Sequence, residues 1–475
     1  MAMTTDTVLE RQALAWMDDP YAAVGYSNTR MHSVPREEAD ALQLAGINLR
    51  LEQRRAQIPV LAKLAEAQHI SRISRLEEAA PLFFTHDMYK SYPVSLLAKS
   101  RFDQINKWLD RLTPYDISGL SVGDVKSIDQ WLDRIGEQTP LDVATSSGTS
   151  GTMSFIPKSK RDYRTSVTGL RVQLTERFGD TGSRADFDEP IHVLTPFYRD
   201  GYSNTARLPV YFLDTFCKGN PARLHTALPF KASADLTWLA ARLRAAQAKG
   251  DTSRIDVPET LLARRAEWER IVADTPTRQA AFIREKVPEM RGQRVFALGL
   301  TNLFYDIARS GLNAGVRAEF APNSVVMAGG GGKGSVLPDD ADEVIRSFFG
   351  VELRGAYGMT EQNFYLVTCG HERLHIPPWV TVLLLDPDSG QPLPRAGVQT
   401  GRASFFDLSQ DGTWGGIVTG DRISVDYGAC PCGRTTLHMD KKIQRFSEIT
   451  GDDDKLTCAA APGAQAEALN LLTSL

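Results

Sequence analysis

The sequence has 475 residues, of which 42% are hydrophobic and 24% charged, so the chain is long enough for a large core with more than one subdomain. This composition excludes a disordered or fibrous protein. With 54 basic and 58 acidic side chains the net charge is -4, which offers no general attraction to nucleic acid or to an anionic membrane.

The N-terminus and the cysteines indicate the cellular compartment. The first residues include early acidic side chains and lack the apolar core of a signal peptide, and no later segment approaches the ~18 uninterrupted apolar residues of a membrane helix. We therefore expect a soluble, cytoplasmic protein whose partners are small molecules or another protein. Five cysteines, at positions 217, 369, 430, 432 and 458, are too few and too unevenly spaced for a disulfide framework, and their clustering indicates a metal site.

The apolar pattern predicts an α/β protein with four segments. Residues 1–135 should form an N-terminal helical region, because apolar positions recur at helical spacing and strand-like runs are nearly absent. Residues 136–380 alternate short apolar runs such as PIHVLTPF with helical stretches such as ADLTWLAARLRAAQ, which is typical of layered α/β sheets. Residues 381–448, with short strands between turns, predict a small antiparallel β subdomain, and residues 449–475 form a short tail.

The segment TSSGTSGT, residues 145–152, predicts a phosphate loop. Its small residues let backbone N–H groups approach an anion, and its hydroxyls add further donors. A solvated linker of the same composition is the alternative.

A second motif, YGMTE at residues 357–361, follows the strand-like run VELRGA and would therefore lie at the carboxyl end of a strand, where open sheets bind ligands. The carboxylate of Glu361 suits Mg²⁺ bridging ATP phosphates, since Mg²⁺ prefers a few carboxylate oxygens together with phosphate. Taken alone, the pentapeptide favours a plain strand-to-helix turn capped by Thr360.

The third motif is Thr419-Gly420-Asp421, at the end of the run GGIVTGD. An acceptor-only carboxylate such as that of Asp421 suits the two hydroxyls of a ribose. Although TGD alone is a common turn, three such motifs in a fixed order are a much stronger signal than any one of them.

With these motifs in this order, the sequence resembles the superfamily of adenylate-forming enzymes, and within it the branch of phenylacetate-CoA ligases and acyl-protein synthetases. The resemblance covers roughly residues 140–456, and it includes the glycine run Ala328–Gly331 and the segment CGRT at residues 432–435. It implies the large N-terminal domain of that family, with layered α/β sheets and a small β subdomain, and contacts with ATP phosphates, adenine, Mg²⁺ and ribose. The implied ATP contacts are Ser146, Gly148, Ser150, Gly151, Thr152, Gly329, Gly330, Gly331, Tyr357, Gly358, Thr360, Asp421 and Arg434, and the implied catalytic residues are Ser147, Thr149 and Glu361, the last also as Mg²⁺ ligand.

Two departures from the wider superfamily are visible. A lysine usually closes the phosphate loop, but here Ser154 stands near that position and Lys158 comes later, as the phenylacetate-CoA ligase branch implies. The basic run from Lys158 to Arg164 is interpreted as a solvated face beside the loop. The C-terminal domain, whose lysine stabilises the adenylation transition state in the family, is expected to be missing or vestigial.

The C-terminal tail raises further alternatives. The hinge segment GDDD, residues 451–454, lacks the family's arginine, for which Arg445 or Arg434 could substitute, while Lys455 could replace the missing lysine. Acyl-protein synthetases pass the acyl group to a cysteine near the C-terminus, and Cys458 lies in such a tail. An incidental exposed cysteine is the competing interpretation.

A structural zinc site is predicted from Cys369, His375, Cys430 and Cys432, because three thiolates and an imidazole suit tetrahedral Zn²⁺. The same arrangement resembles a zinc site in some phenylacetate-CoA ligases. His371 competes with His375 for the fourth position, and cysteines without a metal are the alternative. Four protein ligands leave no open position for a substrate, which indicates a structural role.

These observations predict ATP-dependent activation of a carboxylic acid, by resemblance an aryl or arylacetic acid, to an acyl-adenylate with release of pyrophosphate. The acceptor of the acyl group could be CoA, a carrier-protein thiol, an amine, a separate acceptor enzyme or Cys458. The resemblance also allows a homodimer. A nucleotide-binding scaffold without catalytic activity is the alternative class.

Overall fold

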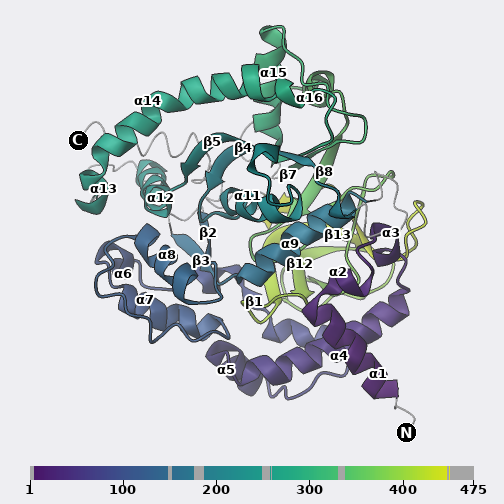
Figure 1. The fold of residues 1–475 in the computed structure, drawn as a ribbon. Coiled ribbons are helices and arrows are strands. Elements are labelled where there is room, and N and C mark those ends of the chain that lie inside the picture. The colour runs from purple at the N-terminus through teal and green to yellow at the C-terminus, as the bar shows by residue number, and fades with distance from the viewer. Residues whose placement is uncertain are drawn as a thin grey trace.

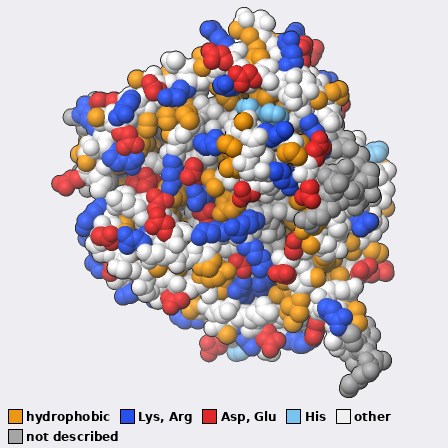
Figure 2. Space-filling view, in the orientation of Figure 1, with side chains coloured by type: hydrophobic (Ala, Val, Ile, Leu, Met, Phe, Trp, Pro, Cys, Tyr) orange, Lys and Arg blue, Asp and Glu red, His pale blue; other side chains and the backbone are white. Residues whose placement is uncertain are grey.

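A computed structural model describes residues 5–147, 152–175, 187–248, 257, 259–329, 337–446 and 449. Figure 1 shows an N-terminal group of helices along one side of the molecule and a sheet with its helices on the other, with the strands of a second sheet between them. Figure 2 shows basic and acidic side chains intermixed over one face, in keeping with the near balance of charges in the sequence. Among the described residues, no helix combines the length and the apolar character that a membrane crossing requires.

The N-terminal region is mainly helical. In α8 (Ile128–Gln138), the hydroxyl of Ser127 caps the first turn by accepting from the N–H of Gln130, and the buried Ile128, Trp131 and Ile135 share one face. The other helices of the region are α1 (Thr5–Asp18), α2 (Pro20–Ala23), α3 (Asn28–Met31), α4 (Arg36–Arg55), α5 (Pro59–Ala67), α6 (Ser95–Ala98) and α7 (Phe102–Leu109), with 3-10 turns η1 (Leu76–Leu82), η2 (His86–Lys90) and η3 (Asp110–Leu112).

A six-stranded sheet forms the α/β layer, in the order β5-β4-β6-β7-β8-β9 among the described residues. Its strands run parallel except β9, which is antiparallel to β8. The strands are β4 (His192–Asp200), β5 (Leu224–Lys231), β6 (Val295–Leu300), β7 (Val325–Gly329), β8 (Leu353–Gly358) and β9 (Tyr365–Val367).

Helices cover both faces of this sheet. Consecutive strand residues enter different cores: Phe296 packs with Phe212 and Phe216, whereas Ala297 belongs to the core that contains Phe304. Helices α15 and α16 contact β6, β7 and β8, while α11 contacts β4 and β5 (Figure 1). The helices of this layer are α9 (Lys160–Gln173), α11 (Asn204–Thr215), α12 (Ala234–Ala248), α13 (Glu259–Ala263), α14 (Arg265–Ala281), α15 (Thr301–Asn313) and α16 (Ala341–Phe349), with η4 (Pro221–Arg223), the π-helical turn η5 (Phe282–Lys286) and η6 (Pro288–Met290).

A second, seven-stranded sheet has the path β10-β14-β13-β12-β11, with β1 and β15 also pairing with β13. It draws on more of the chain than the predicted segment 381–448, because β10 precedes that segment and β1 comes from the helical region, where Phe84 and Thr85 pair in parallel with Ile417 and Val418. Its strands are β1 (Phe84–Thr85), β10 (Arg373–His375), β11 (Val380–Leu385), β12 (Val398–Asp407), β13 (Gly416–Asp426), β14 (His438–Asp440) and β15 (Gln444–Arg445).

The connection between β12 and β13 is buried. Its backbone carbonyls need partners away from water, and two arginines of α4 supply them. The guanidinium of Arg50 donates to the carbonyl of Leu408 at 2.7 Å, and that of Arg54 donates to the carbonyl of Asp411 at 3.0 Å. These hydrogen bonds join the N-terminal helical region to the β12–β13 connection.

Candidate active site and metal cluster

The strands on either side of the predicted phosphate loop form a hairpin. Strand β2 (Ala144–Ser147) pairs with β3 (Met153–Ile156), with Ser146 opposite Ser154 and Ser147 opposite Met153. Thr152, the last residue of the predicted loop, is partly exposed. The remaining predicted loop residues, Gly148, Thr149, Ser150 and Gly151, lie outside the described residues, as do Gly330, Gly331, Lys455 and Cys458.

Tyr357 and Asp421 join the two sheets. Tyr357 lies near the end of β8, and its hydroxyl donates to the Asp421 carboxylate at 2.8 Å. Asp421 lies within β13, not at the turn that its sequence suggests, and the Arg445 guanidinium lies 3.9 Å from it. Burial, with the Asp421 charge in addition, raises the pKa of Tyr357 well above its ordinary value, so the hydroxyl stays a donor. The predicted ribose carboxylate is thus held at the meeting point of the sheets.

Glu361 follows this junction three residues beyond the end of β8, on a partly buried turn. The backbone carbonyl of Glu361 accepts from the Gln410 side-chain amide at 3.0 Å, which links the turn to the buried β12–β13 connection. Burial raises the pKa of the Glu361 carboxyl, and the charge of His86 opposes that rise. A desolvated carboxylate suits a hard divalent cation, so the Glu361 side chain fits the predicted role of Mg²⁺ ligand, which stays a prediction.

The two described glycines of the predicted ATP site are required by the packing. A Cβ on Gly358 would lie 2.7 Å from a ring carbon of Tyr365 on the adjacent β9, and one on Gly329 would lie 3.0 Å from the Ala356 carbonyl oxygen on β8. Both positions therefore exclude a side chain whether or not nucleotide is bound, and their contacts with adenine stay a prediction.

Arg434 lies in the loop between β13 and β14, in a surface pit lined also by Cys430. Its charge acts on His32 and His375, beside the cysteine cluster. By contrast, Arg445 pairs through its backbone with Asp421 and faces the same carboxylate with its side chain. Arg434 and Arg445 were both candidates to replace the hinge arginine of the family. Of the two, Arg445 is the one that lies beside Asp421, the candidate ribose ligand.

Lys158 corrects the interpretation of residues 158–164 as a solvated face. Only 1% of the surface of Lys158 is exposed, and its ammonium donates to the Gln362 carbonyl and to the Asn363 side chain, both at 2.9 Å. Asp162 and Tyr163 in the same run are fully buried, whereas Arg164 is exposed. The sequence interpretation was wrong for Lys158 because these hydrogen-bond partners lie on a distant turn.

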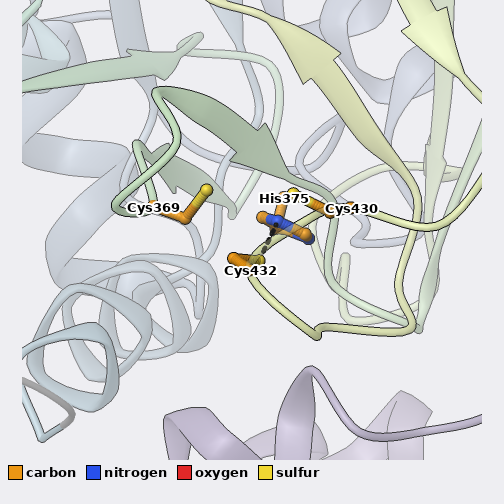
Figure 3. A group of neighbouring side chains, drawn as sticks. All are labelled: Cys369, His375, Cys430 and Cys432. Carbon is orange, nitrogen blue, oxygen red and sulfur yellow. Dashed lines mark hydrogen bonds between the residues drawn. The ribbon is translucent and has the colours of Figure 1, made fainter.

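The structure brings together the four side chains predicted to bind zinc. The sulfur atoms of Cys369, Cys430 and Cys432 and the ring nitrogen of His375 all lie within 4.8 Å of one another (Figure 3). Ligands of a tetrahedral Zn²⁺ with Zn–S bonds of about 2.3 Å lie roughly 3.8 Å apart, so the donor set and its spacing fit that ion. His371 is exposed and is not in this group, which leaves His375 as the imidazole ligand.

Neighbouring groups orient His375. Its Nδ1 lies 3.3 Å from the Thr436 hydroxyl, which also bonds to Nδ1 of His32 at 2.8 Å, while its Nε2 lies 3.2 Å from the Cys432 sulfur. A partner on one ring nitrogen leaves the other for a metal. Burial, with the Arg434 charge in addition, lowers the pKa of His375 to about 3, so the imidazole is neutral as a ligand must be.

We expect Tyr357→Phe to lower ATP affinity about tenfold, because loss of a hydrogen bond to a charged group frees the Asp421 carboxylate to rotate away from the ribose. Calorimetry with Mg·ATP measures the change. Tyr26→Phe is the matched control, since the Tyr26 hydroxyl donates to the Asp19 carboxylate at 3.1 Å in the N-terminal region. Equal affinity in Tyr357→Phe and wild type would contradict a role of this pair in nucleotide binding.

No protein-family model matches the sequence, and no curated protein matches it. Among solved structures, 2-hydroxyisobutyryl-CoA ligase in an open conformation with 2-HIB-AMP and CoA matches 88% of this chain and 71% of its own, at 12% identity and a TM-score of 0.50. The same ligase in its postadenylation state with R3-HIB-AMP matches 88% and 70%, at 13% identity and a TM-score of 0.51. This likeness concerns the fold alone, and the chain shares the fold of the matched part of that ligase. The predicted α/β class, with layered sheets and a further β-sheet, is confirmed, whereas the expected lack of a C-terminal domain stays a prediction.

Proposed function

We propose that this protein is an adenylate-forming ligase that activates a carboxylic acid with ATP and releases pyrophosphate. The observation that carries the proposal is the junction of the two sheets, where the Tyr357 hydroxyl holds Asp421 and the turn bearing Glu361 follows directly. The proposed ligand roles require these residues to lie together, and the hydrogen bond joins Tyr357 to Asp421 across 64 positions of the sequence.

In the proposed reaction, a substrate carboxylate oxygen attacks the α-phosphorus of ATP. A bond forms between that oxygen and phosphorus, the bond from phosphorus to the bridging oxygen breaks, and pyrophosphate leaves with the electron pair. Little proton transfer is needed, so the residues act by positioning and charge neutralisation. Asp421 holds the ribose, and Ser147, Thr149 and the loop amides hold the phosphates.

Glu361 would supply the carboxylate for Mg²⁺, an ion that would neutralise charge on the phosphates. Burial raises the pKa of Tyr357, and the charges of Asp421 and Glu361 raise it further, which supports a shared role of the three residues. Glu361 itself is desolvated, which strengthens its interaction with a cation.

For the acyl acceptor we propose only a chemical class, a thiol or an amine. The neighbouring ligase was solved with CoA, and a thiol or an amine would each attack the carbonyl carbon of the adenylate and release AMP. The aryl or arylacetic nature of the acid rests on the sequence resemblance. Transfer to Cys458 is the alternative, and it would leave a thioester on the protein itself.

We propose further that the four-residue cluster holds a structural Zn²⁺. Three thiolates and one oriented imidazole fill the four positions of a tetrahedron and leave none for a substrate. The ion would join the segment between β9 and β10 to the loop before β14, and so brace the sheet that carries Asp421.

A pyrophosphate-release screen tests the proposed function. Purified protein is given Mg·ATP and one member at a time of a panel of aryl, arylacetic, fatty and amino acids, each with and without CoA. We expect release that depends on one class of acid, and stimulation by CoA would identify the acceptor. Tight Mg·ATP binding without release for any acid, CoA present or absent, would favour a nucleotide-binding scaffold instead.

A further inference from the structure

Lys158 is a buried cation that has no role in the proposed reaction as described above. It lies two residues beyond β3, the second strand of the phosphate hairpin, and 1% of its surface is exposed. A buried ammonium is costly unless its hydrogen bonds are satisfied. Its two acceptors, the Gln362 carbonyl and the Asn363 side-chain oxygen, directly follow Glu361 in the chain.

Asn363 is fixed from every side. Its backbone N–H donates to Asp407 at 3.2 Å, and its side-chain amide donates to Asp162 at 2.7 Å. Asp162 also accepts from the backbone N–H of Gly412 at 2.9 Å, so the same carboxylate holds the buried β12–β13 connection. Lys158 supplies the remaining charge-assisted bonds to this turn, which therefore has a single well-defined position.

The charges around Lys158 favour this arrangement. Burial lowers the pKa of Lys158, and the carboxylates of Asp162, Asp407 and Glu361 oppose that change. In return, the ammonium acts on Glu361 and lowers the pKa of that carboxyl, against the larger effect of burial. These three carboxylates thus favour the charged form of Lys158, which makes its two hydrogen bonds to the turn charge-assisted.

We propose that Lys158 is a positioning residue for the Mg²⁺ site: through Gln362 and Asn363 it fixes the turn that carries Glu361 relative to the phosphate hairpin from which Lys158 extends. This inference rests on the proposed adenylation. Lys158 touches neither nucleotide nor metal in this arrangement and acts through the turn.

The test compares Lys158→Met and Lys158→Arg with Lys160→Met. Lys160 is the matched control, because its ammonium likewise donates to two acceptors, here the backbone carbonyls of Gly136 at 2.6 Å and Thr139 at 3.1 Å, at the end of α8. We measure the Mg²⁺ concentration that gives half-maximal pyrophosphate release, and ATP affinity by calorimetry with Mg²⁺ and with EDTA. Loss of an outer partner of a metal ligand lowers metal affinity about 10- to 100-fold, and we expect a Mg²⁺ requirement raised by that factor in Lys158→Met.

We expect the Mg²⁺ requirement of Lys158→Arg to lie between those of wild type and Lys158→Met, and that of Lys160→Met to equal the wild-type value. ATP affinity in EDTA should be unchanged in all three variants. If Lys158→Met does not fold, Lys158→Arg tests the same role, because the longer arginine side chain would still displace the turn that carries Glu361. A wild-type Mg²⁺ requirement in the folded Lys158 variants overturns the inference. So does an equal loss in Lys160→Met, or a parallel loss of ATP affinity in EDTA, since either would show a general structural effect.

The proposed function can fail separately. If wild type binds Mg·ATP but releases no pyrophosphate with any acid, adenylation is wrong. The inference about Lys158 is then decided by the ratio of ATP affinities with Mg²⁺ and with EDTA in the same variants. If Mg²⁺ strengthens ATP binding at least about tenfold less in Lys158→Met than in wild type, and Lys160→Met behaves as wild type, the role of Lys158 is supported. If Mg²⁺ strengthens ATP binding equally in Lys158→Met and wild type, that role is excluded.

Discussion

Replacing Glu361 by glutamine should lower acid-dependent pyrophosphate release by roughly 100- to 1,000-fold, the cost of removing one preorganised electrostatic contact from an active site. The amide keeps the size of the side chain but cannot supply an anionic ligand to Mg²⁺. The defect should lie mainly in kcat and in the Mg²⁺ requirement. ATP affinity in EDTA should stay near the wild-type value, because Asp421 and Tyr357 still hold the ribose. Steady-state release at varied Mg²⁺ measures both effects.

The same carboxylate sets a pH dependence. Burial raises the pKa of Glu361, and only its ionised form binds the cation, so the Mg²⁺ requirement of wild type should rise as the pH falls toward that pKa. Glu361→Gln should lose this dependence. Glu285→Gln, which removes an exposed carboxylate, is the control and should behave as wild type in rate and in pH profile. A Glu361→Gln rate close to that of wild type would exclude Glu361 as the metal ligand.

Cys432→Ala should abolish zinc binding and destabilise the chain by about 4 kcal/mol, the scale at which loss of a bound metal falls among single substitutions. The substitution leaves three potential ligands, Cys369, Cys430 and His375, so the metal would lose one of its four protein bonds and with it the binding free energy that stabilises the fold. We expect about one zinc per wild-type chain by atomic emission, in keeping with one four-ligand cluster. Denaturant unfolding measures the loss of stability.

Hydrogen exchange should locate the effect of the missing metal. Protection should fall in residues 369–375 and 427–440, which carry the ligands, and less in the six-stranded sheet. Cys217→Ala is the matched control, since Cys217 is fully buried in an apolar core and should retain zinc when replaced. Wild type that contains no zinc after refolding with the metal, or Cys432→Ala that retains it, would refute the site.

The local patterns of the sequence predicted the elements that carry the site. The run VELRGA corresponds to β8 and is followed by the Glu361 turn, and the run PIHVLTPF corresponds to β4. The grouping of Cys369, His375, Cys430 and Cys432 was also predictable, because cysteine and histidine at short spacings indicate metal ligands without knowledge of the fold. In each case the signal lies within a few neighbouring residues.

The features that the sequence did not predict depend on contacts between distant segments of the chain. Lys158 bonds to groups 204 and 205 positions away, and nothing in its neighbours distinguishes it from an exposed lysine. The pairing of β1 with β13 joins two residues of the helical region to a strand more than 300 positions later, and with it His86 comes close to Glu361. The buried lysine could have been suspected from its position just after an apolar strand, but its acceptors required the structure.

The most direct test of adenylation is the identity of the nucleotide product. After a single turnover with an acid that is active in the screen and with ATP labelled at the α-phosphorus, the quenched mixture is separated and its labelled species identified. We expect label in acyl-AMP and AMP in amounts matching the pyrophosphate released, with both lost in Glu361→Gln. Label appearing in ADP, with orthophosphate released in place of pyrophosphate, would show attack at the γ-phosphorus and would contradict adenylation.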